Sequence, residues 1–164
     1  MRINRALLVN GVAKTIEESL DFSSVSFDPT HIRSIPKCDV KATLTDYDEL
    51  LYVQVEIKAT VIGVCSYTLE DVELKFNINE SLTFSSNEED EDSYYEKDMI
   101  FDLDSYILGI LLANVPVRII KKGAKLPENG NGYRVMSEDD YEKEKKQKPD
   151  PRWDKLDSVQ FDDD

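Results

Sequence analysis

The residues of this 164-residue chain that could do chemistry are few and stand apart from one another. The single histidine, His31, lies in an Asp-Pro-Thr-His turn beside Arg33 and could act as a general base near neutral pH. Cys65 follows a strand-like segment, and a nucleophilic or redox role for its thiol needs a neighbouring base or cation. The sequence shows no such partner. We therefore interpret His31 as a histidine in a surface turn and Cys65 as a small buried residue at a strand end.

Recognisable metal-binding and nucleotide-binding motifs do not occur in this sequence. It contains no GxSxG, no HExxH and no phosphate-binding loop, and its glycines are scattered. The two cysteines, Cys38 and Cys65, form no CxxC pair, which indicates free thiols in a reducing compartment; one disulfide between them is the alternative. We expect no catalytic residue, no metal, no cofactor and no enzymatic activity.

An acidic cluster is better suited to binding than to catalysis. Carboxylates crowd residues 86–101 and are densest over Glu88, Glu89, Asp90, Glu91 and Asp92. The run lacks the glycine that a calcium-binding loop needs at its sharp turn. We interpret it as a solvated loop whose charges repel one another.

A basic cluster follows about twenty residues later in the chain. It consists of Arg118, Lys121, Lys122 and Lys125, in a segment without carboxylates. The simpler interpretation is that these residues balance the acidic loop or keep their segment soluble. The functional interpretation is a small patch for phosphate or an acidic protein, in which about four phosphate contacts support weak, salt-sensitive binding.

Alternating side chains predict the framework that carries these clusters. Apolar residues recur at every second position in residues 40–44, 51–61 and 72–78, which is typical of strands with one buried face. Short turn-forming segments separate the three runs, so we predict long antiparallel strands in a meander. The residues before them predict a short helical opening and an extended lead-in.

An apolar helix is predicted over residues 102–115, between the two charged clusters. Asp102 is the candidate N-cap, and Pro116 ends the helix because it moves Val115 out of the helical region. Apolar side chains cover most of the circumference, which predicts burial on more than one side. We expect the sheet to cover one side, and either a loop or a second subunit to cover the other.

The C-terminal residues predict a small subdomain. Residues 117–121 predict a short strand, Asn-Gly turns predict a hairpin over 128–135, and the charged run 137–148 predicts an exposed helix. A last short helix begins at Pro151 and docks through apolar residues that include Trp153. An acidic tail closes the sequence.

Together these elements predict an α+β fold in a single domain. The fold is a long-stranded antiparallel meander sheet packed by one apolar helix, with a small C-terminal hairpin/helix subdomain. Its predicted parts are an N-terminal helix and lead-in (1–34), the sheet (35–85), the acidic loop (86–101), the core helix (102–115) and the C-terminal subdomain with its tail (116–164).

Composition and charge exclude several classes of protein. A hydrophobic content of 40% is typical of a globular chain. A formal net charge of -14 argues against whole-surface attraction to nucleic acid or an anionic membrane, and favours a basic protein partner. The opening residues show no signal-peptide cleavage pattern, and the longest apolar run is far shorter than a membrane span. We expect a soluble, cytoplasmic protein.

Three stretches of sequence, taken together, resemble the bacterial YceD family, also called large ribosomal RNA subunit accumulation proteins. They are VCSYTLEDVELKFNINESLTF, DLDSYILGILLANVPV and the terminal DPRWDKL, separated by the acidic loop and the basic segment. The likeness runs from about Asp39 to Val159. It implies a role in accumulation of large-subunit ribosomal RNA (23S rRNA), in a family whose genes lie beside that of a large-subunit ribosomal protein and for which no enzymatic activity is established.

One departure from the family pattern concerns a metal site. Many members carry a knuckle of four cysteines between the helix and the terminal DPR segment, but here that region contains neither cysteine nor histidine. Four-ligand closure is impossible there, so zinc is not carried over. The chain is more similar to metal-free members from low-GC Gram-positive bacteria, and the Asn-Gly hairpin would organise the region instead.

The resemblance implies a non-enzymatic accessory factor in large ribosomal subunit biogenesis, which binds a ribosomal protein or a pre-ribosomal particle. The alternative is a protein-interaction module that forms a homodimer through the apolar helix, and a second competitor is an enzyme acting through Cys65 or His31. The expected contacts with a basic protein are Glu88, Glu89, Asp90, Glu91 and Asp92. The expected contacts with RNA or a second partner are Arg118, Lys121, Lys122, Lys125, Arg152 and Trp153.

Overall fold

A computed structural model of the chain describes residues 1–47 and 49–147. The chain forms two compact units, Met1–Lys122 and Gly123–Asp164. The single-domain expectation placed the start of the C-terminal subdomain a few residues earlier, at residue 116. Asp150, Pro151, Arg152, Trp153 and the acidic tail lie outside the described residues.

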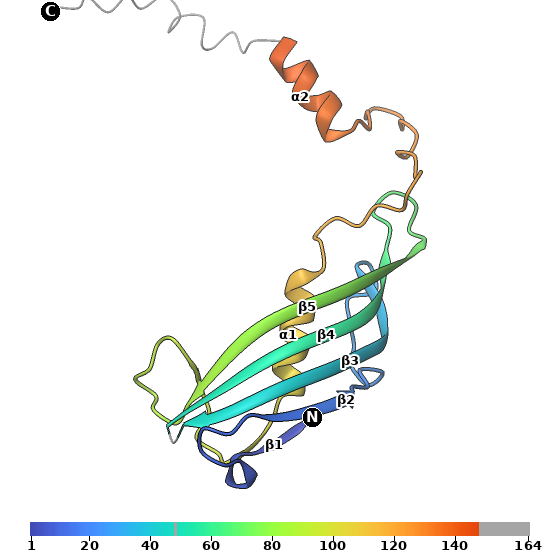
Figure 1. Cartoon of the computed structure of the whole chain (residues 1–164). Helices are drawn as coiled ribbons and strands as arrows, with labels where there is room; N and C mark the ends of the chain where they lie inside the picture. Colours follow the sequence, from blue (N-terminus) through green and yellow to red (C-terminus); the bar gives the residue numbers. More distant parts are fainter. Residues whose placement is uncertain (48, 148–164) are drawn as a thin grey trace, which may run out of the picture. The chain divides into compact units, whose positions relative to one another are not determined.

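A five-stranded sheet dominates the first unit (Figure 1). Its three long central strands form the antiparallel meander predicted from the alternating residues, and the α+β fold class is confirmed. β6 joins the edge of β5 in parallel. In spatial order the strands are β2 (Lys14–Ser19), β3 (Ile32–Tyr47), β4 (Leu50–Val64), β5 (Asp71–Ser85) and β6 (Tyr94–Tyr95).

The period of two in the sequence separates a buried inner face from a polar outer face. In β4, Leu51, Val53 and Ile57 are at most 1% exposed, whereas Gln54 and Glu56 between them face solvent. Burial of each large aliphatic side chain stabilises the fold by about 1.5–3 kcal/mol. The alternation therefore fixes which side of every long strand faces the core.

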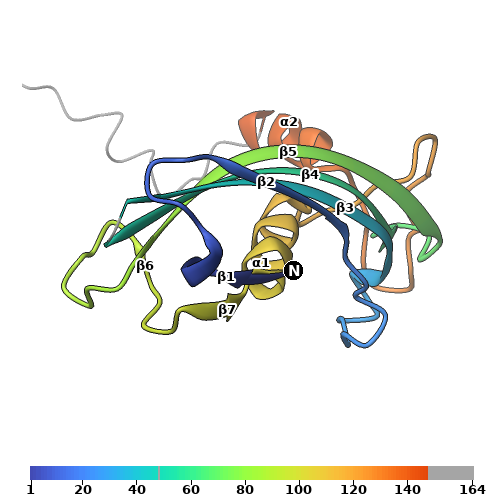
Figure 2. The same ribbon diagram turned by 60° about the horizontal axis from the view of Figure 1, so that its bottom comes forward.

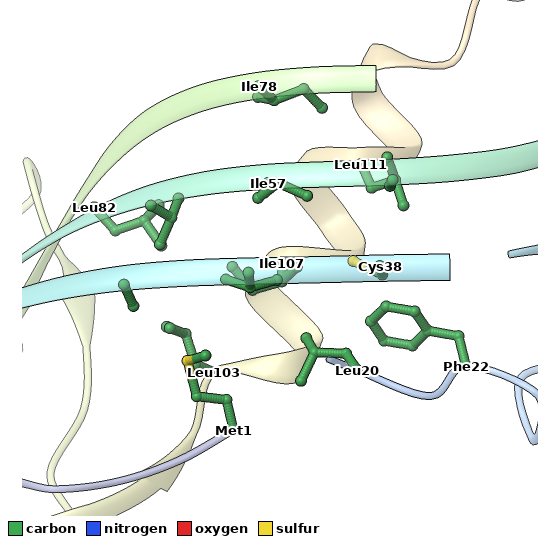
Figure 3. Close-up of a cluster of buried hydrophobic side chains, with 14 of the residues drawn as sticks. Met1, Leu20, Phe22, Cys38, Ile57, Ile78, Leu82, Leu103, Ile107 and Leu111 are labelled. Atoms are coloured by element: carbon green, nitrogen blue, oxygen red, sulfur yellow. The ribbon is translucent and has the colours of Figure 1, made fainter. Parts of the chain in front are cut away.

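Helix α1 (Asp104–Asn114) lies under the sheet, which curves over it (Figure 2). Leu103, Ile107 and Leu111, spaced at four residues, are all 0% exposed. They meet the inner face of the sheet near Ile57 and Ile78 (Figure 3). This contact is the core of the unit.

The predicted helix boundaries and its burial on several sides need correction. Asp102 is not the N-cap: it ends a short strand, β7 (Ile100–Asp102), and Leu103 holds the cap position without a side-chain cap bond. The Asp102 carboxylate still accepts a hydrogen bond from the Asp104 amide at 3.0 Å. Only one face of α1 is buried, since Leu112 is 37% exposed. The sheet provides that cover, and the remaining apolar residues are half-buried or exposed.

The expected helical opening is wrong, because residues 2–4 and 14–19 form strands and the helical part between them is one 3₁₀ turn. β1 (Arg2–Asn4) pairs antiparallel with β7, and the 3₁₀ turn Arg5–Leu7 follows. Ile3 is 1% exposed in this pairing. The partner of β1 is about a hundred residues away in sequence, so local periodicity could not indicate it.

The predicted strand at residues 117–121 is absent. This segment is irregular, with Val117 94% exposed and Ile119 2% exposed. The Ile119 carbonyl accepts a hydrogen bond from the Ser66 amide at 2.8 Å. A buried isoleucine and hydrogen bonds to residues 65 and 66 hold this segment without a strand pairing.

The second unit contains a small turn and a helix in its described part. The predicted hairpin is reduced to an isolated bridge between Gly130 and Tyr133. The predicted exposed helix is present as α2 (Glu138–Gln147). The Ser137 hydroxyl accepts a hydrogen bond from the Asp140 amide at 3.1 Å and so caps the helix start. Within residues 1–47 and 49–147, no helix is long and apolar enough to cross a membrane.

Candidate functional site

The five carboxylates expected to contact a basic protein lie together on the loop between β5 and β6. Four of them, Glu88, Glu89, Glu91 and Asp92, are exposed, and Asp90 is half-buried. The loop is shaped locally, because the Asn87 and Asp90 side chains accept hydrogen bonds from amides two residues further on, at 3.1 and 3.3 Å. The result is a short acidic loop that projects beyond one end of the sheet (Figures 1 and 2).

Aromatic contacts fix the point at which this acidic loop returns to the fold. Tyr94 and Phe84 both pack against the ring of Tyr106 on α1, with ring centroids 5.1 and 5.0 Å apart. The Tyr106 hydroxyl donates a hydrogen bond to the Glu96 carboxylate at 2.7 Å. Burial, together with the Glu96 carboxylate, raises the pKa of Tyr106 to about 12. The loop therefore has anchored ends and an exposed acidic tip.

The basic cluster is partly engaged within its own unit. The Arg118 guanidinium lies 5.8 Å from the centre of the Tyr67 ring, within cation–π distance. The Lys121 ammonium lies 3.1 Å from a Glu70 carboxylate oxygen. Arg118, Lys121 and Lys122 are exposed in the first unit, and Lys125 belongs to the second unit. A single four-residue patch therefore stays a prediction.

Cys65 links the β4–β5 turn to the segment that carries the basic cluster. Its sulfur accepts a hydrogen bond from the Lys121 amide at 3.3 Å. That bond, followed by one from the Thr68 hydroxyl, lowers the pKa of the Cys65 thiol to about 7. The thiol is 0% exposed, so no outside molecule reaches it in this conformation. The arrangement supports a structural role for this residue.

Cys38 is equally enclosed on the inner face of β3. It is 1% exposed, and burial is the main cause that raises the pKa of its thiol to about 11. Both Cys38 and Cys65 are free thiols, as the spacing in the sequence indicated.

His31 lies beside a hollow of about 270 Å³ lined by Ser26, Phe27, Asp28, His31, Ile32 and Leu112. The Asp28 carboxylate accepts hydrogen bonds from the Thr30 amide and hydroxyl at 2.9 and 2.7 Å. These bonds lower the pKa of Asp28, and they engage its carboxylate within the turn. The His31 amide bonds to the Asp28 carbonyl. The geometry is that of a capped turn, as the sequence indicated for His31.

Metal binding receives no support from the described part of the chain. Residues 1–47 and 49–147 bring together no group of three or more His, Cys, Asp or Glu side chains that could hold an ion. Arg152 and Trp153, expected as partner contacts, lie outside the described residues.

Three exposed tyrosines form a feature that was not predicted from the sequence. Tyr47, Tyr52 and Tyr95 are 52%, 43% and 43% exposed. Two of them occupy outward positions of long strands, where most residues are polar. In the sequence, these tyrosines could have been noticed because an aromatic residue stands where the alternating pattern expects a polar one.

The chain is similar to one described family and to a curated bacterial protein. Residues 53–160 match the family described as large ribosomal RNA subunit accumulation protein YceD. An uncharacterised protein of Bacillus subtilis (strain 168), YlbN, is 26% identical over 145 residues, which is 83% of this chain and 81% of that protein. No solved structure matches the chain.

Proposed function

Because this chain belongs to the YceD family of large ribosomal RNA subunit accumulation proteins, we propose that it is an accessory factor in bacterial large ribosomal subunit biogenesis that supports accumulation of 23S rRNA. The family match spans both units, from β4 into the C-terminal residues. Ribosome assembly takes place in the cytoplasm, the compartment expected from the sequence. The family membership is the observation that carries this proposal.

The proposed partner of the acidic loop is a basic protein of the large subunit or of its assembly particle. Ribosomal proteins are basic because they neutralise RNA phosphates, so a chain of net charge -14 attracts them at long range. Glu88, Glu89, Asp90, Glu91 and Asp92 stand on one anchored loop that projects into solvent. Such a loop could hold a basic protein until RNA displaces the carboxylates.

The proposed second contact uses the basic cluster. Arg118, Lys121, Lys122 and Lys125, together with Arg152 and Trp153, would touch RNA or a second partner. Engagement of Lys121 by Glu70 and of Arg118 by Tyr67 reduces the charge available to phosphate. We therefore expect RNA contact to be weak and strongly dependent on salt.

A non-enzymatic mode of action agrees with the chemistry of the described residues. The Cys65 thiol is enclosed, and the carboxylate next to His31 is bonded to its own turn. Accessory binding requires neither group to react. Substitution of Cys65 or His31 by Ala should accordingly leave the cellular phenotype unchanged.

Depletion of the protein tests the proposed function. The expected result is reduced 23S rRNA and fewer large subunits in a sucrose-gradient profile, restored by the wild-type chain. Unchanged RNA levels and unchanged profiles would remove the ribosomal proposal. A pull-down at low and high salt adds the partner: capture of a ribosomal protein that is lost in high salt supports the charge-based contact.

The homodimer through α1 remains the alternative. Leu112, 37% exposed on α1, belongs to its uncovered side, whereas Ile107 and Leu111 are already buried under the chain's own sheet. Analytical ultracentrifugation at micromolar concentration measures whether the chain is a monomer or a dimer. A dimer is required by the homodimer alternative and is not required by the accessory-factor proposal.

A further inference from the structure

A row of outward-facing residues crosses four strands at the end of the sheet from which the acidic loop projects. In the strand register Tyr47 lies opposite Leu50, Leu50 opposite Ser85, and Ser85 opposite Tyr95. Directly opposed residues point to the same face of a sheet. The row therefore brings Tyr95 onto the same face as Tyr47 and Leu50, which lie more than forty residues earlier in the sequence.

The inner residues next to this row establish which face it occupies. Leu51 and Phe84 are 0% exposed in the core. Tyr94 and Glu96 contact Tyr106 of α1 on the inner side, so Tyr95 between them points outward. Because side chains alternate along a strand, Leu50 and Ser85 also point to the outer side. Leu50 is half-buried and Ser85 is only 1% exposed, so the tyrosines supply most of the accessible surface.

A third tyrosine extends the row into a patch. Tyr52 is the outward residue two positions after Leu50, and its ring meets Tyr47 edge to face with centroids 5.9 Å apart. Its neighbours across the sheet are Thr45 and Thr83. We define Tyr47, Tyr52 and Tyr95 as the tyrosine patch; each keeps 43–52% of its surface exposed.

The acidic loop and the tyrosine patch are joined by the chain itself. The loop begins directly after Ser85 and ends at β6, which contributes Tyr95, so both ends of the loop meet the row. The Ser85 hydroxyl accepts a hydrogen bond from the Asn87 amide at 3.0 Å and holds the loop entry against the row. Exposed aromatic faces and carboxylates both attract cations.

We propose that the tyrosine patch and the acidic loop form one docking surface for an extended, Lys/Arg-rich segment of a basic protein. Lysine and arginine side chains lie on the rings of Tyr47, Tyr52 and Tyr95 while neighbouring cations pair with Glu88, Glu89 and Glu91. Strands lie about 4.8 Å apart, so the row spans roughly 14 Å and accommodates about four extended residues. The aromatic faces select the basic side chains, and the loop attracts them from a distance.

Single-stranded RNA also stacks on exposed aromatic rings, but the charge here disfavours it. RNA-binding surfaces surround their aromatic residues with a positive groove that follows the phosphates. Here the loop that starts next to the patch carries five carboxylates, and the chain has a formal net charge of -14. A basic protein segment satisfies both the rings and the charge.

The inference rests on the proposed function only in taking the basic protein to be ribosomal. Its test therefore uses purified components, whose binding does not depend on the ribosomal role. A short fluorescein-labelled peptide of Lys, Arg and Gly is titrated with the full chain and followed by fluorescence anisotropy. The triple variant Y47L/Y52L/Y95L should weaken binding by about two- to fivefold per ring removed, the range of exposed cation–π contacts. The variant Y47F/Y52F/Y95F keeps the aromatic faces and should bind as the wild type does.

The charge contribution has a matched control. E88Q/E89Q/E91Q should weaken binding at low salt by more than tenfold and remove most of its salt dependence. E17Q/E56Q/E80Q changes the net charge equally on strands β2, β4 and β5 and should weaken binding much less. Circular dichroism establishes that each variant is folded before it is titrated.

Defined outcomes would overturn the proposal. Equal peptide affinity for Y47L/Y52L/Y95L and the wild type contradicts the role of the rings. Equal losses for the two carboxylate variants show that only overall charge matters. Binding of a polyuridine oligonucleotide that disappears in Y47L/Y52L/Y95L assigns the patch to RNA. Peptide binding as expected, with unchanged ribosome profiles after depletion, supports the docking surface and contradicts only the ribosomal role.

Discussion

The Tyr106 hydroxyl on α1 donates a hydrogen bond to the Glu96 carboxylate, with 2.7 Å between the oxygens. This bond joins the core helix to the segment by which the acidic loop returns to the sheet. Tyr94, two residues before Glu96, packs on the Tyr106 ring. The helix thus sets where the end of the acidic loop lies.

Tyr106→Phe should lower the free energy of unfolding by about 1 kcal/mol, because it removes the hydrogen bond and keeps the ring. Urea unfolding measures this change, and limited proteolysis should cleave the acidic loop faster. Tyr133→Phe, a 65% exposed residue of the second unit, is the control. Equal proteolysis of both variants and the wild type would contradict the anchoring role.

The raised pKa of the Met1 amino group predicts that the free energy of unfolding falls as the pH rises into the alkaline range. Burial alone lowers its pKa, but the hydrogen bond and charge of Asp104, with Asp102 and Glu18, outweigh burial and raise it above 8.0. A raised folded-state pKa adds stability that is complete below pH 8 and lost as the pH rises through the folded value. Urea unfolding at several pH values measures the trend.

Asp104→Asn isolates this contribution from other groups that titrate at high pH. The variant removes the hydrogen-bonding charge nearest the amino group, so its stability should change less between pH 7 and the alkaline range. Parallel curves for the variant and the wild type would show that the amino group does not contribute.

Substitution by alanine of two neighbouring leucines on α1 should lower the free energy of unfolding by very different amounts. Leu111→Ala leaves a cavity at a 0% exposed position and should cost about 2–5 kcal/mol in unfolding free energy. Leu112→Ala, at a 37% exposed position, should cost less than about 1 kcal/mol. Chemical denaturation measures both. A larger loss for Leu112 would indicate that the uncovered side of α1 is buried in solution, as in the homodimer.

The Cys65 thiol should resist alkylation despite a pKa of about 7. Thiolate formation favours reaction, but a 0% exposed sulfur cannot meet iodoacetamide without local unfolding. Mass spectrometry should detect slow modification of the native chain and rapid modification in urea. Rapid native labelling of Cys65 would show an accessible nucleophile and renew the enzyme alternative.

Much of the first unit was predictable because its strands bury one face locally. Val53 and Ile57 alternate with polar residues, and that period of two is enough to identify a strand. The acidic loop was predictable for a similar reason, since Glu88–Asp92 has no apolar residue to bury. The same reasoning failed at β1, at β7 and at residues 117–121, where partners distant in sequence decide the conformation.

Side-chain type and short spacing were enough to predict the meander, the apolar helix, the charged clusters and the family likeness. The pairing of Ile3 with Phe101, and the placement of Tyr95 on the same outer face as Tyr47, became known from the folded chain. Strand register is a property of two segments at once, since each hydrogen-bonded pair depends on residues distant in the chain. Surfaces assembled across strands, and the proposed docking surface among them, therefore become visible only in the folded chain.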